Sequence, residues 1–530
     1  MINIIGAGLA GLSAAMELAE REIPCRLISL QPSERAQSVL AEGGINAALD
    51  TMNEHDSPAE HFNDTMRGGC FLADPNAVYG LTSSAPDIVR RLLSLGVPFG
   101  LNDKGIVLRN FGGQKKKRTA YSKSSTGKIL MTALIDTVRR YESAGLVKRL
   151  PHHELIKLRI EKGVCQGAVL RDCYSGECQS LSGQVILALG GLNGLFPGRT
   201  TGTTQNTADA AAELFSQGVH FCDLEMLQYH PTTIPIPGKR CLITEAARGE
   251  GGRLWISRNG EKWYFMEEKY PELGNLMPRD VVAREMFFVR RQEDTQGEVM
   301  LDMTGLSDEI WAKRLSDLRD NIIAHTGLDP KRSPIEVHEG IHYFMGGIAV
   351  DEQHRTNISG LYAAGECCGQ YHGANRLGGN SMLGAVYGGG VAARTAAEEY
   401  APSDDTAFPA EAGELSAEAR PEFNEQLAAI LAEGLGIVRS GRKLEEALKK
   451  LGELEAVCLR EENRSRLGLA MLRSAIARRE SRGAHYREDF PETDESFRKM
   501  TLALCEGNDA DISFQVIPER RTADAASDRN

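Results

Sequence analysis

The chain has 530 residues, 42% of them hydrophobic and 25% charged, enough to bury a large core divided among about three to four structural units. Its 61 Lys and Arg against 73 Asp and Glu give a formal net charge of -12, which excludes the overall basic character of a nucleic-acid-binding protein. No segment reaches the ~18 consecutive apolar residues of a membrane span, and no basic secretory signal precedes the first apolar run. We therefore expect a cytoplasmic protein that does not insert into a membrane.

The N-terminal segment has the pattern of the first βα unit of a dinucleotide-binding fold. Residues 3–5 form a short apolar strand, residues 6–11 read GAGLAG, and a helix rich in Ala and Leu follows to about Ala19. In this GxGxxG motif the glycines permit a tight turn and close backbone approach, and the helix N-terminus attracts a pyrophosphate. The acidic residue that often binds the ribose ~20 residues further on is missing, because residues 29–31 read SLQ.

Further apolar runs predict the remaining strands of this domain. Residues 26–30 fit the second parallel strand, and residues 185–189 form another apolar run, which Gly190 and Gly191 follow. Residues 360–366 predict another strand, whose carboxyl end meets a ligand. These runs lie far apart in the chain, so we expect the nucleotide domain to be interrupted by an insertion.

The predicted division of the chain follows from these runs and from shifts in composition. Residues 401–413 have the composition of a linker, and the apolar residues beyond them recur at helical spacing. Residues 520–530 form a polar tail that we expect to be disordered. The expected parts are a nucleotide domain at 1–229 and 342–400, a capping domain for the substrate at 230–341, and a C-terminal helical domain with its tail at 401–530.

The eleven cysteines are not arranged to bind a metal. They form no CxxC pair, and neither Cys173 with Cys178 nor the adjacent Cys367 and Cys368 has the spacing of zinc or iron–sulfur ligands. We predict no metal site and reduced, mostly buried thiols. Because a haem CxxCH motif is also missing, the chain itself supplies no electrons, and an electron donor must come from outside.

Several motifs give the sequence a specific family resemblance. The most specific is HGANRLGGNS at residues 372–381. The others are EGGINAA at 42–48, DSPAEHFNDT at 56–65, FGG at 111–113 with RT at 118–119, QYHPT at 228–232, ITEAARGEGG at 243–252, PRDVVAR at 278–284, HYFMGG at 342–347 and ESRGAH at 480–485. With these motifs the chain resembles, over nearly its whole length, the succinate dehydrogenase and fumarate reductase flavoprotein family, which also contains L-aspartate oxidase.

This resemblance implies an α/β protein: a Rossmann-like FAD-binding domain, an inserted α+β capping domain and a C-terminal helical domain. It also implies the residues that bind FAD. They are Gly6, Ala7, Gly8, Gly11, Ser38, Gly43, Gly44, Asp209, Glu366, Ser381 and Met382. A buried isoalloxazine needs backbone donors and small residues for close approach, which the glycine-rich motifs can supply.

Two departures from the family pattern affect the flavin. The TGDG of the family reads Thr207-Ala208-Asp209-Ala210 here, so both glycines are lost and the turn must avoid a positive φ or be strained. Gln37 stands where respiratory members carry the histidine that links covalently to the flavin. An amide cannot form that link, so the resemblance implies non-covalent FAD and favours fumarate reduction over succinate oxidation.

The resemblance also implies a site for a C4 dicarboxylate. Two buried negative charges need cations and donors, and the residues matching the family's carboxylate binders are His230, Thr244, His342 and Arg376. For the reduction of fumarate, it assigns the proton donor to Arg284, with Glu245 and Arg248 relaying protons from solvent. Glu245 and Arg248 are three residues apart, so on a helical turn they share one face.

Three functions remain open at this stage. The first is a fumarate reductase, or a succinate-oxidising relative, and residues 377–381, LGGNS, favour it. The second is L-aspartate oxidase, which usually has MASNS there but shares the missing covalent histidine. The third is one subunit of a complex that receives electrons from an iron–sulfur protein. The donor could also be a free flavin or a thiol.

Overall fold

The computed structural model describes residues 1–123, 125–400, 408, 410 and 413–521. The linker expected at 401–413 and the tail expected at 520–530 therefore lie mostly outside the described residues. A parallel five-stranded sheet forms the centre of the nucleotide domain, in the order β22-β12-β1-β2-β8. Its strands are β22 (Leu361–Ala363), β12 (Val185–Leu187), β1 (Ile2–Ile5), β2 (Cys25–Ser29) and β8 (Val147–Pro151).

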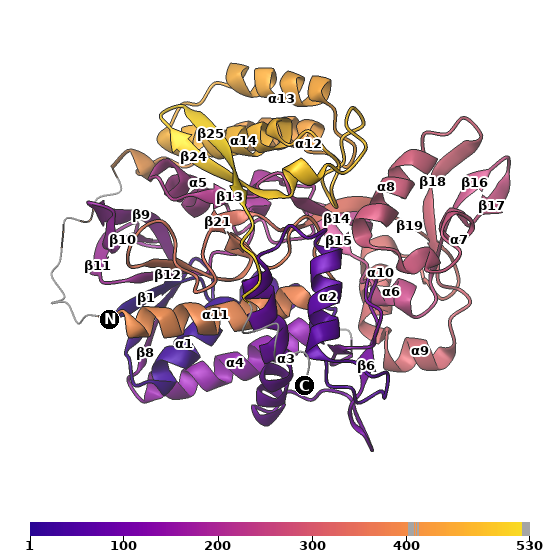
Figure 1. The fold of residues 1–530 in the computed structure, drawn as a ribbon, viewed down its shortest axis with the longest axis horizontal. Helices are drawn as coiled ribbons and strands as arrows, with labels where there is room; N and C mark the ends of the chain where they lie inside the picture. The colour runs from indigo at the N-terminus through magenta and orange to yellow at the C-terminus, as the bar shows by residue number, and fades with distance from the viewer. Residues whose placement is uncertain (124, 401–407, 409, 411–412, 522–530) are drawn as a thin grey trace.

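Helices cover this sheet and bury its apolar strands. The helices α1 (Leu9–Glu20), α4 (Thr126–Ser143) and α11 (Asn380–Glu398) pack together beside the sheet (Figure 1). Ile2 and Ile4 of β1 are fully buried, as continuous apolar strands are in a parallel sheet. The distant apolar runs predicted as strands join this sheet, because β12 pairs with β1 and β22 pairs with β12.

Smaller elements surround the nucleotide domain. An antiparallel sheet of β9 (His153–Glu161), β10 (Val164–Asp172) and β11 (Cys178–Ser182) flanks one end. The helices α2 (Pro58–Gly68), α3 (Pro75–Ser94) and α5 (Asp209–Ser216) lie around the body. Short strands complete this part: β3 (Ile45–Asn46), β4 (Leu101–Asn102), β5 (Gly105–Ile106), β6 (Leu108–Arg109) and β7 (Thr119–Ala120).

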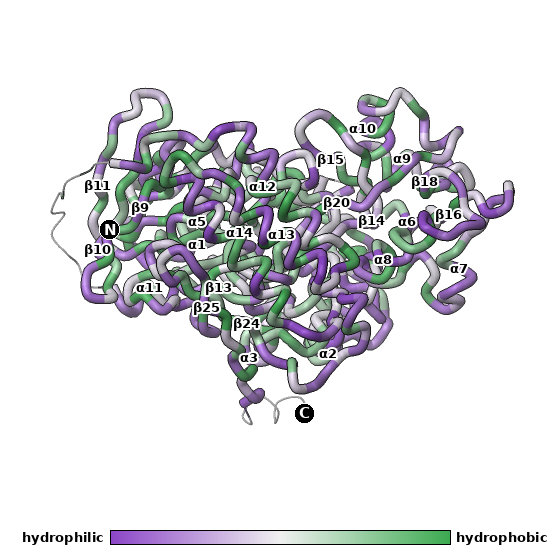
Figure 2. Tube along the Cα trace, turned by 90° about the horizontal axis from the view of Figure 1, so that it is seen from above, coloured by the Kyte–Doolittle hydropathy of each residue, from purple (hydrophilic) through white to green (hydrophobic). Residues whose placement is uncertain are grey.

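The inserted segment forms a lobe at one end of the molecule, with its own hydrophobic cluster (Figure 2). One antiparallel sheet has the order β15-β14-β20, and a second has the order β17-β16-β18-β19. The strands are β14 (Leu227–Ile236), β15 (Lys239–Leu242), β20 (His338–Phe344), β16 (Arg253–Arg258), β17 (Glu261–Trp263), β18 (Thr295–Asp302) and β19 (Ile335–Glu336). The helices are α6 (Ala246–Gly249), α7 (Phe265–Lys269), α8 (Arg279–Val289), α9 (Asp308–Lys313) and α10 (Ser316–Thr326).

The C-terminal part contains the predicted helices and a β-hairpin. The helices are α12 (Pro421–Gly434), α13 (Gly441–Glu453) and α14 (Leu459–Ala477), and the hairpin strands are β24 (Lys499–Glu506) and β25 (Asp509–Val516). The hairpin extends a mixed sheet ordered β23-β21-β13-β24-β25, with β13 (Phe221–Cys222), β21 (Gly347–Ala349) and β23 (Cys368–Gly369). The last segment of the chain thus completes a sheet that begins in the nucleotide domain.

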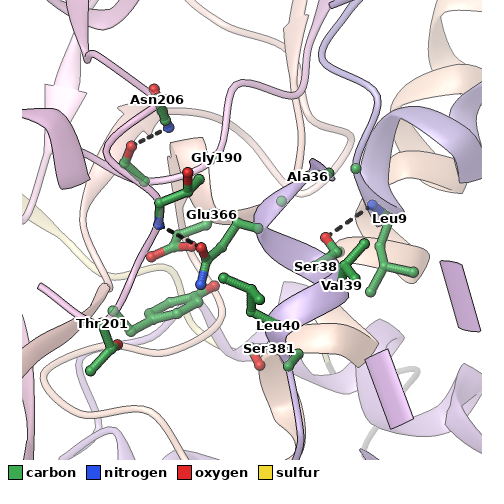
Figure 3. A pocket seen from close by; sticks show the side chains of 18 of the residues that line it. Leu9, Ala36, Ser38, Val39, Leu40, Gly190, Thr201, Asn206, Glu366 and Ser381 are labelled. Carbon is green, nitrogen blue, oxygen red and sulfur yellow. Dashed lines mark hydrogen bonds between the residues drawn. The ribbon is translucent and has the colours of Figure 1, made fainter. Parts of the chain in front are cut away.

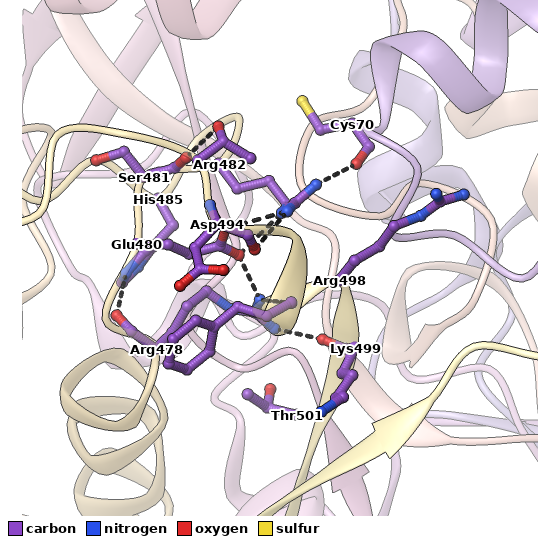
Figure 4. Close-up of polar contacts among 12 residues, drawn as sticks. Cys70, Arg478, Glu480, Ser481, Arg482, His485, Asp494, Arg498, Lys499 and Thr501 are labelled. Carbon is purple, nitrogen blue, oxygen red and sulfur yellow. Dashed lines mark hydrogen bonds and ion pairs between the residues drawn. The ribbon is translucent and has the colours of Figure 1, made fainter.

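A buried ion network anchors the ESRGAH motif (Figure 4). Glu480 accepts hydrogen bonds from Arg478 and Arg482 at 2.9 Å each, and Arg482 also donates to the carbonyl of Cys70 at 3.0 Å. Ala484 N donates to the carbonyl of Ala374 at 2.9 Å. The C-terminal motif therefore packs directly against the HGANR loop. None of the described helices combines the length and apolar character needed to cross a bilayer.

Candidate active site

One cavity of about 590 Å³ runs from the β1–α1 turn to the capping lobe. Its size is within the usual range for a ligand site. The predicted residues that line it are Gly6, Ala7, Gly8, Ser38, Gly43, Gly44, Glu366, Ser381, Met382, His230, Thr244, Glu245, His342 and Arg376. Gly11, Asp209, Arg248 and Arg284, which were also predicted, do not line it. Sequence reasoning missed Arg279 and Tyr343, which do.

The glycine turn leaves the space that a dinucleotide needs. Gly6 has φ +118°, and a Cβ there would lie 2.0 Å from the Ala188 carbonyl oxygen. A Cβ on Gly11 would lie 1.9 Å from the Gly6 carbonyl oxygen, so Gly11 permits the close helix–strand packing although it does not face the cavity. Ser38 Oγ accepts from Leu9 N at 3.2 Å at the start of α1 (Figure 3). These residues fit the pyrophosphate part of FAD.

Gln37 and Glu366 both line the cavity where a flavin would lie. Gln37 Oε1 accepts from Thr203 N at 2.6 Å, so the amide holds the neighbouring loop. Glu366 accepts from Phe344 N at 3.1 Å, and burial raises the pKa of its carboxyl to about 7. A Cβ on Gly191 would lie 2.6 Å from Glu366 Oε1, so this wall has room only for a glycine.

Asp209 does not occupy the position expected of a flavin ligand. Its side chain accepts from Arg464 Nε at 2.6 Å and from Arg460 Nη1 at 3.3 Å, both on α14. These arginines draw the carboxylate away from the cavity, which is lined instead by Ala210 and Ala211 of the same helix. The expected strain is present, because Ala208 has φ +65° and ψ +6°, the left-handed conformation.

Two neutral histidines form one wall of the capping side. Burial, followed by the charge of Arg279, lowers the pKa values of His230 and His342 well below the ordinary value. His230 Nδ1 lies 3.2 Å from both the backbone N and the carbonyl oxygen of Thr232, so it is partnered within its own strand. Among the described residues, the buried Nε2 of His230 has no hydrogen-bond partner. His342 Nδ1 is bonded to Thr201 Oγ1 at 2.7 Å, and the two imidazole centroids lie 5.1 Å apart.

Two arginines close to these histidines share one glutamine acceptor. Gln228 Oε1 accepts from Arg376 Nη2 at 3.0 Å and from Arg279 Nη1 at 3.1 Å. The Arg376 guanidinium also lies over the Tyr343 ring, 4.4 Å from its centroid, and its Nε is buried without a partner among the described residues. Burial and the charge of Arg279 lower the pKa of Arg376 to about 9, so it remains a cation at neutral pH.

Glu245 links the cations of the capping side. Its Oε2 accepts from Arg279 Nε at 2.8 Å, and its Oε1 accepts from Gly112 N at 2.9 Å. Arg248 lies 3.9 Å from Glu245 and donates to the Asn275 carbonyl at 2.6 Å. Burial raises the pKa of Glu245, but Arg279 and Arg248 outweigh it, so the net shift is downward. The carboxylate therefore stays ionised between two arginines.

Arg284 lies away from this cluster. Its guanidinium is 4.0 Å from Asp280 and over the Tyr486 ring, and its side chain remains 23% exposed. Arg279 begins the same helix, and five residues of an α-helix turn the side-chain direction by about 140°. The position expected of Arg284 is therefore held by Arg279, which the same PRDVVAR motif also contains. Helical periodicity within that motif is the signal that distinguishes them.

Fold and site together define an FAD-dependent oxidoreductase. Residues 2–382 match the family described as FAD binding domain, and residues 456–524 match the one described as Fumarate reductase flavoprotein C-term. The chain is 36% identical to the succinate dehydrogenase flavoprotein subunit of Bacillus subtilis, with 98% of each covered. It is 35% identical to the 8-methylmenaquinol:fumarate reductase flavoprotein subunit of Wolinella succinogenes, covering 96% of this chain and 89% of that one.

Solved structures agree with these relatives. The E. coli quinol fumarate reductase FrdA chain superimposes with a TM-score of 0.87 at 29% identity, covering 98% of this chain and 97% of that one. The chain belongs to the succinate dehydrogenase and fumarate reductase flavoprotein family. The resemblance predicted from the motifs and the fold class that it implied are thus confirmed.

Proposed function

We propose that this chain interconverts fumarate and succinate, in the fumarate-reducing direction, with non-covalently bound FAD. The observation that carries the proposal is the charge of the buried cluster around Glu245 and Gln228. Arg248, Arg279 and Arg376 contribute three positive charges and Glu245 one negative charge, while the two histidines are neutral. The resulting charge of +2 balances the two carboxylates of a C4 dicarboxylate.

Unpartnered nitrogens support the same ligand. His230 Nε2 and Arg376 Nε are buried without a partner among the described residues, as are Nε and Nη2 of Arg248. A buried donor without an acceptor costs about 1–3 kcal/mol, more when it is charged. His230 and Arg376 line the cavity, so the carboxylates of a bound substrate could give their unpartnered nitrogens a partner. Thr244 lines the same wall and can add a hydroxyl.

We assign proton delivery to Arg279, with Glu245 and Arg248 as the relay. Bound FAD supplies the two-electron redox chemistry. Arg279 lines the cavity and is held by Glu245 and Gln228, so its guanidinium is fixed beside the neutral histidines and Arg376. Glu245 can return a proton to Arg279 from Arg248, whose guanidinium lies 3.9 Å from it on the other side. Arg376 polarises one substrate carboxylate and thereby makes the alkene electron-poor.

The mode of FAD binding and the electron donor are assigned from the cavity lining and from the relatives. Gln37 lines the flavin part and offers an amide, so we assign FAD to non-covalent binding. Both curated relatives are named as flavoprotein subunits, which favours an iron–sulfur protein as the electron donor. The chain contains no internal donor motif.

Anaerobic reduction of the FAD-loaded protein tests the proposal. The reduced flavin should be reoxidised promptly by fumarate and slowly, if at all, by the cis isomer maleate, because fixed cations and donors select one separation of the two carboxylates. If the reduced flavin is reoxidised by oxygen but not by fumarate, the proposal is wrong. Bleaching of the oxidised flavin by aspartate, with peroxide formed in air, would identify an aspartate oxidase instead. Comparing the rates of succinate oxidation and fumarate reduction under matched conditions tests the direction.

A further inference from the structure

A short segment joins the substrate side of the cavity to the flavin side. Arg376 lies at one end, and Ser381 and Met382, which line the flavin part, lie at the other. Between them Gly379 adopts φ +84° at the N-cap of α11, and Asn380 is the first helical residue. Any shift of this segment would move the substrate cation relative to the flavin-lining end of α11.

Asn46 holds this segment from the strand that follows the flavin-binding Gly43-Gly44 turn. Its Nδ2 donates to the Gly378 carbonyl at 2.8 Å and to Asn380 Oδ1 at 2.7 Å. Its Oδ1 accepts from Thr119 Oγ1 at 2.6 Å, and its backbone N donates to the Gly379 carbonyl at 3.2 Å. A Cβ on Gly379 would lie 2.1 Å from Asn46 Oδ1, so the two chain segments are in close contact.

Asn380 is held from the opposite side by α2. His61 Nε2 is 3.0 Å from Asn380 Oδ1, and Asn380 Nδ2 donates to Thr65 Oγ1 at 3.0 Å. Thr65 Oγ1 in turn donates to the His61 carbonyl at 2.8 Å. Burial and the charge of Arg118 lower the pKa of His61 to about 3, so it acts as a neutral donor. Arg118 is enclosed between Asp56 and Asp64 at 2.9 Å each.

None of these groups touches the cavity. Asn46, His61, Thr119 and Asn380 are fully buried, and they are not among the residues that line it. A buried polar network in which the amide groups are bonded specifies one arrangement of the backbone. Its influence on the site therefore passes through the backbone of residues 376–382.

We infer that Asn46 and Asn380 are positioning residues, which fix the substrate-binding Arg376 relative to the flavin-lining start of α11. The inference rests on the proposed function, because it assigns the network to the geometry of fumarate reduction. A displacement of 1 Å at a reacting centre can lower the rate about 100-fold. Loss of the network should therefore affect substrate turnover and FAD binding together, whereas loss of a carboxylate ligand affects the substrate alone.

The main test compares Asn380→Ala with Asn463→Ala. Asn463 is a matched control because it is a similarly buried asparagine, bonded to Glu213 and Ser216 outside the cavity. For each variant we would measure melting temperature, the Kd for FAD, and kcat and KM for fumarate. We expect N380A to lower kcat/KM about 100-fold and to weaken FAD binding several-fold, and N463A to change only the melting temperature. Equal effects of the two variants on kcat/KM and Kd would overturn the inference.

Two variants of His61 provide a second test in case N380A does not fold. His61→Gln keeps an N–H donor toward Asn380, whereas His61→Ala removes it. We expect H61A to lower kcat/KM and FAD affinity and H61Q to restore most of both, and no difference between them at equal stability would contradict the inference. If the wild-type protein does not turn over fumarate, the proposed function fails. In that case the Kd for FAD alone tests the role of the network. A Kd that is unchanged in N380A and H61A would reject that role.

Discussion

Arg279 and Arg284 belong to the same helix, α8, yet their guanidinium groups face different surroundings. Arg279 is bonded to the buried Glu245 at 2.7 Å and lines the cavity. Arg284 is partly exposed, near Asp280 and the ring of Tyr486. The two side chains therefore provide a matched comparison of a guanidinium inside the site with one outside it.

Arg279→Ala should abolish fumarate turnover while FAD stays bound. Proton delivery and one of three site cations are lost together, so we expect kcat to fall by about three to four orders of magnitude. Arg284→Ala should retain kcat within about threefold, because its side chain does not reach the cavity. Steady-state kinetics with FAD content measured on the same samples checks this. A larger loss in R284A than in R279A would restore the assignment made from the motif alone.

Gln37 gives a direct test of how FAD is held. Because its side chain is an amide and accepts from Thr203 N, the wild-type protein should release all its flavin on acid precipitation. In Gln37→His an imidazole is placed at the same wall, and we expect part of the flavin to remain with the precipitated chain. Flavin fluorescence of the supernatant and of the pellet measures the released and the retained flavin in each protein. Flavin retained by the wild type would contradict the non-covalent assignment.

Much of the fold could be predicted because its signals are local. The apolar run and glycine turn at residues 3–11 specify β1 and α1, and the HGANRLGGNS motif marks the segment between substrate and flavin. The β24–β25 hairpin was missed, although alternating residues flank Gly507 within 499–516, because the helical spacing before it dominated the interpretation.

The errors in the site have a different cause, since they depend on distant partners. Asp209 turns away from the cavity because Arg460 and Arg464, about 250 residues later, bind its carboxylate. The link between His61 and Asn380 spans 319 residues. No local pattern specifies such pairs. For Arg279 and Arg284, helical periodicity could have shown that the two side chains face different directions.

Ala208→Gly should stabilise the protein. Ala208 adopts φ +65°, which costs a non-glycine residue roughly 1–2 kcal/mol, whereas glycine enters this region freely. Part of the gain is offset by the greater entropy of glycine in the unfolded chain, so we expect about 0.5–1 kcal/mol more unfolding free energy. Ala211→Gly, inside the helix α5 that follows Ala208, should instead destabilise by about 1 kcal/mol. Urea unfolding of the two variants beside the wild type tests the opposite signs.

Each histidine that is buried in the neutral form should contribute less stability as the pH is lowered below 6.5. His354 is an example outside the active site: Nδ1 donates to the Ala363 carbonyl at 2.6 Å, and Nε2 accepts from Gln370 Nε2 at 3.0 Å. Burial lowers its pKa from 6.5 to about 4, although the Ala363 bond and Asp351 oppose the shift. Between these values the unfolded chain takes up a proton that the folded protein excludes.

The contribution of His354 can be isolated by substitution. Each such histidine removes up to about 1.4 kcal/mol of unfolding free energy per pH unit of acidification, which amounts to about 2 kcal/mol between pH 6.5 and pH 5. His354→Gln cannot titrate, so the difference in unfolding free energy between pH 7 and pH 5 should shrink by about that amount. The exposed His325, replaced by Gln, provides a control for the removal of a histidine from the chain. Urea unfolding at both pH values measures this difference, and an unaltered difference in H354Q would show that the folded imidazole takes up its proton as it does in the unfolded chain.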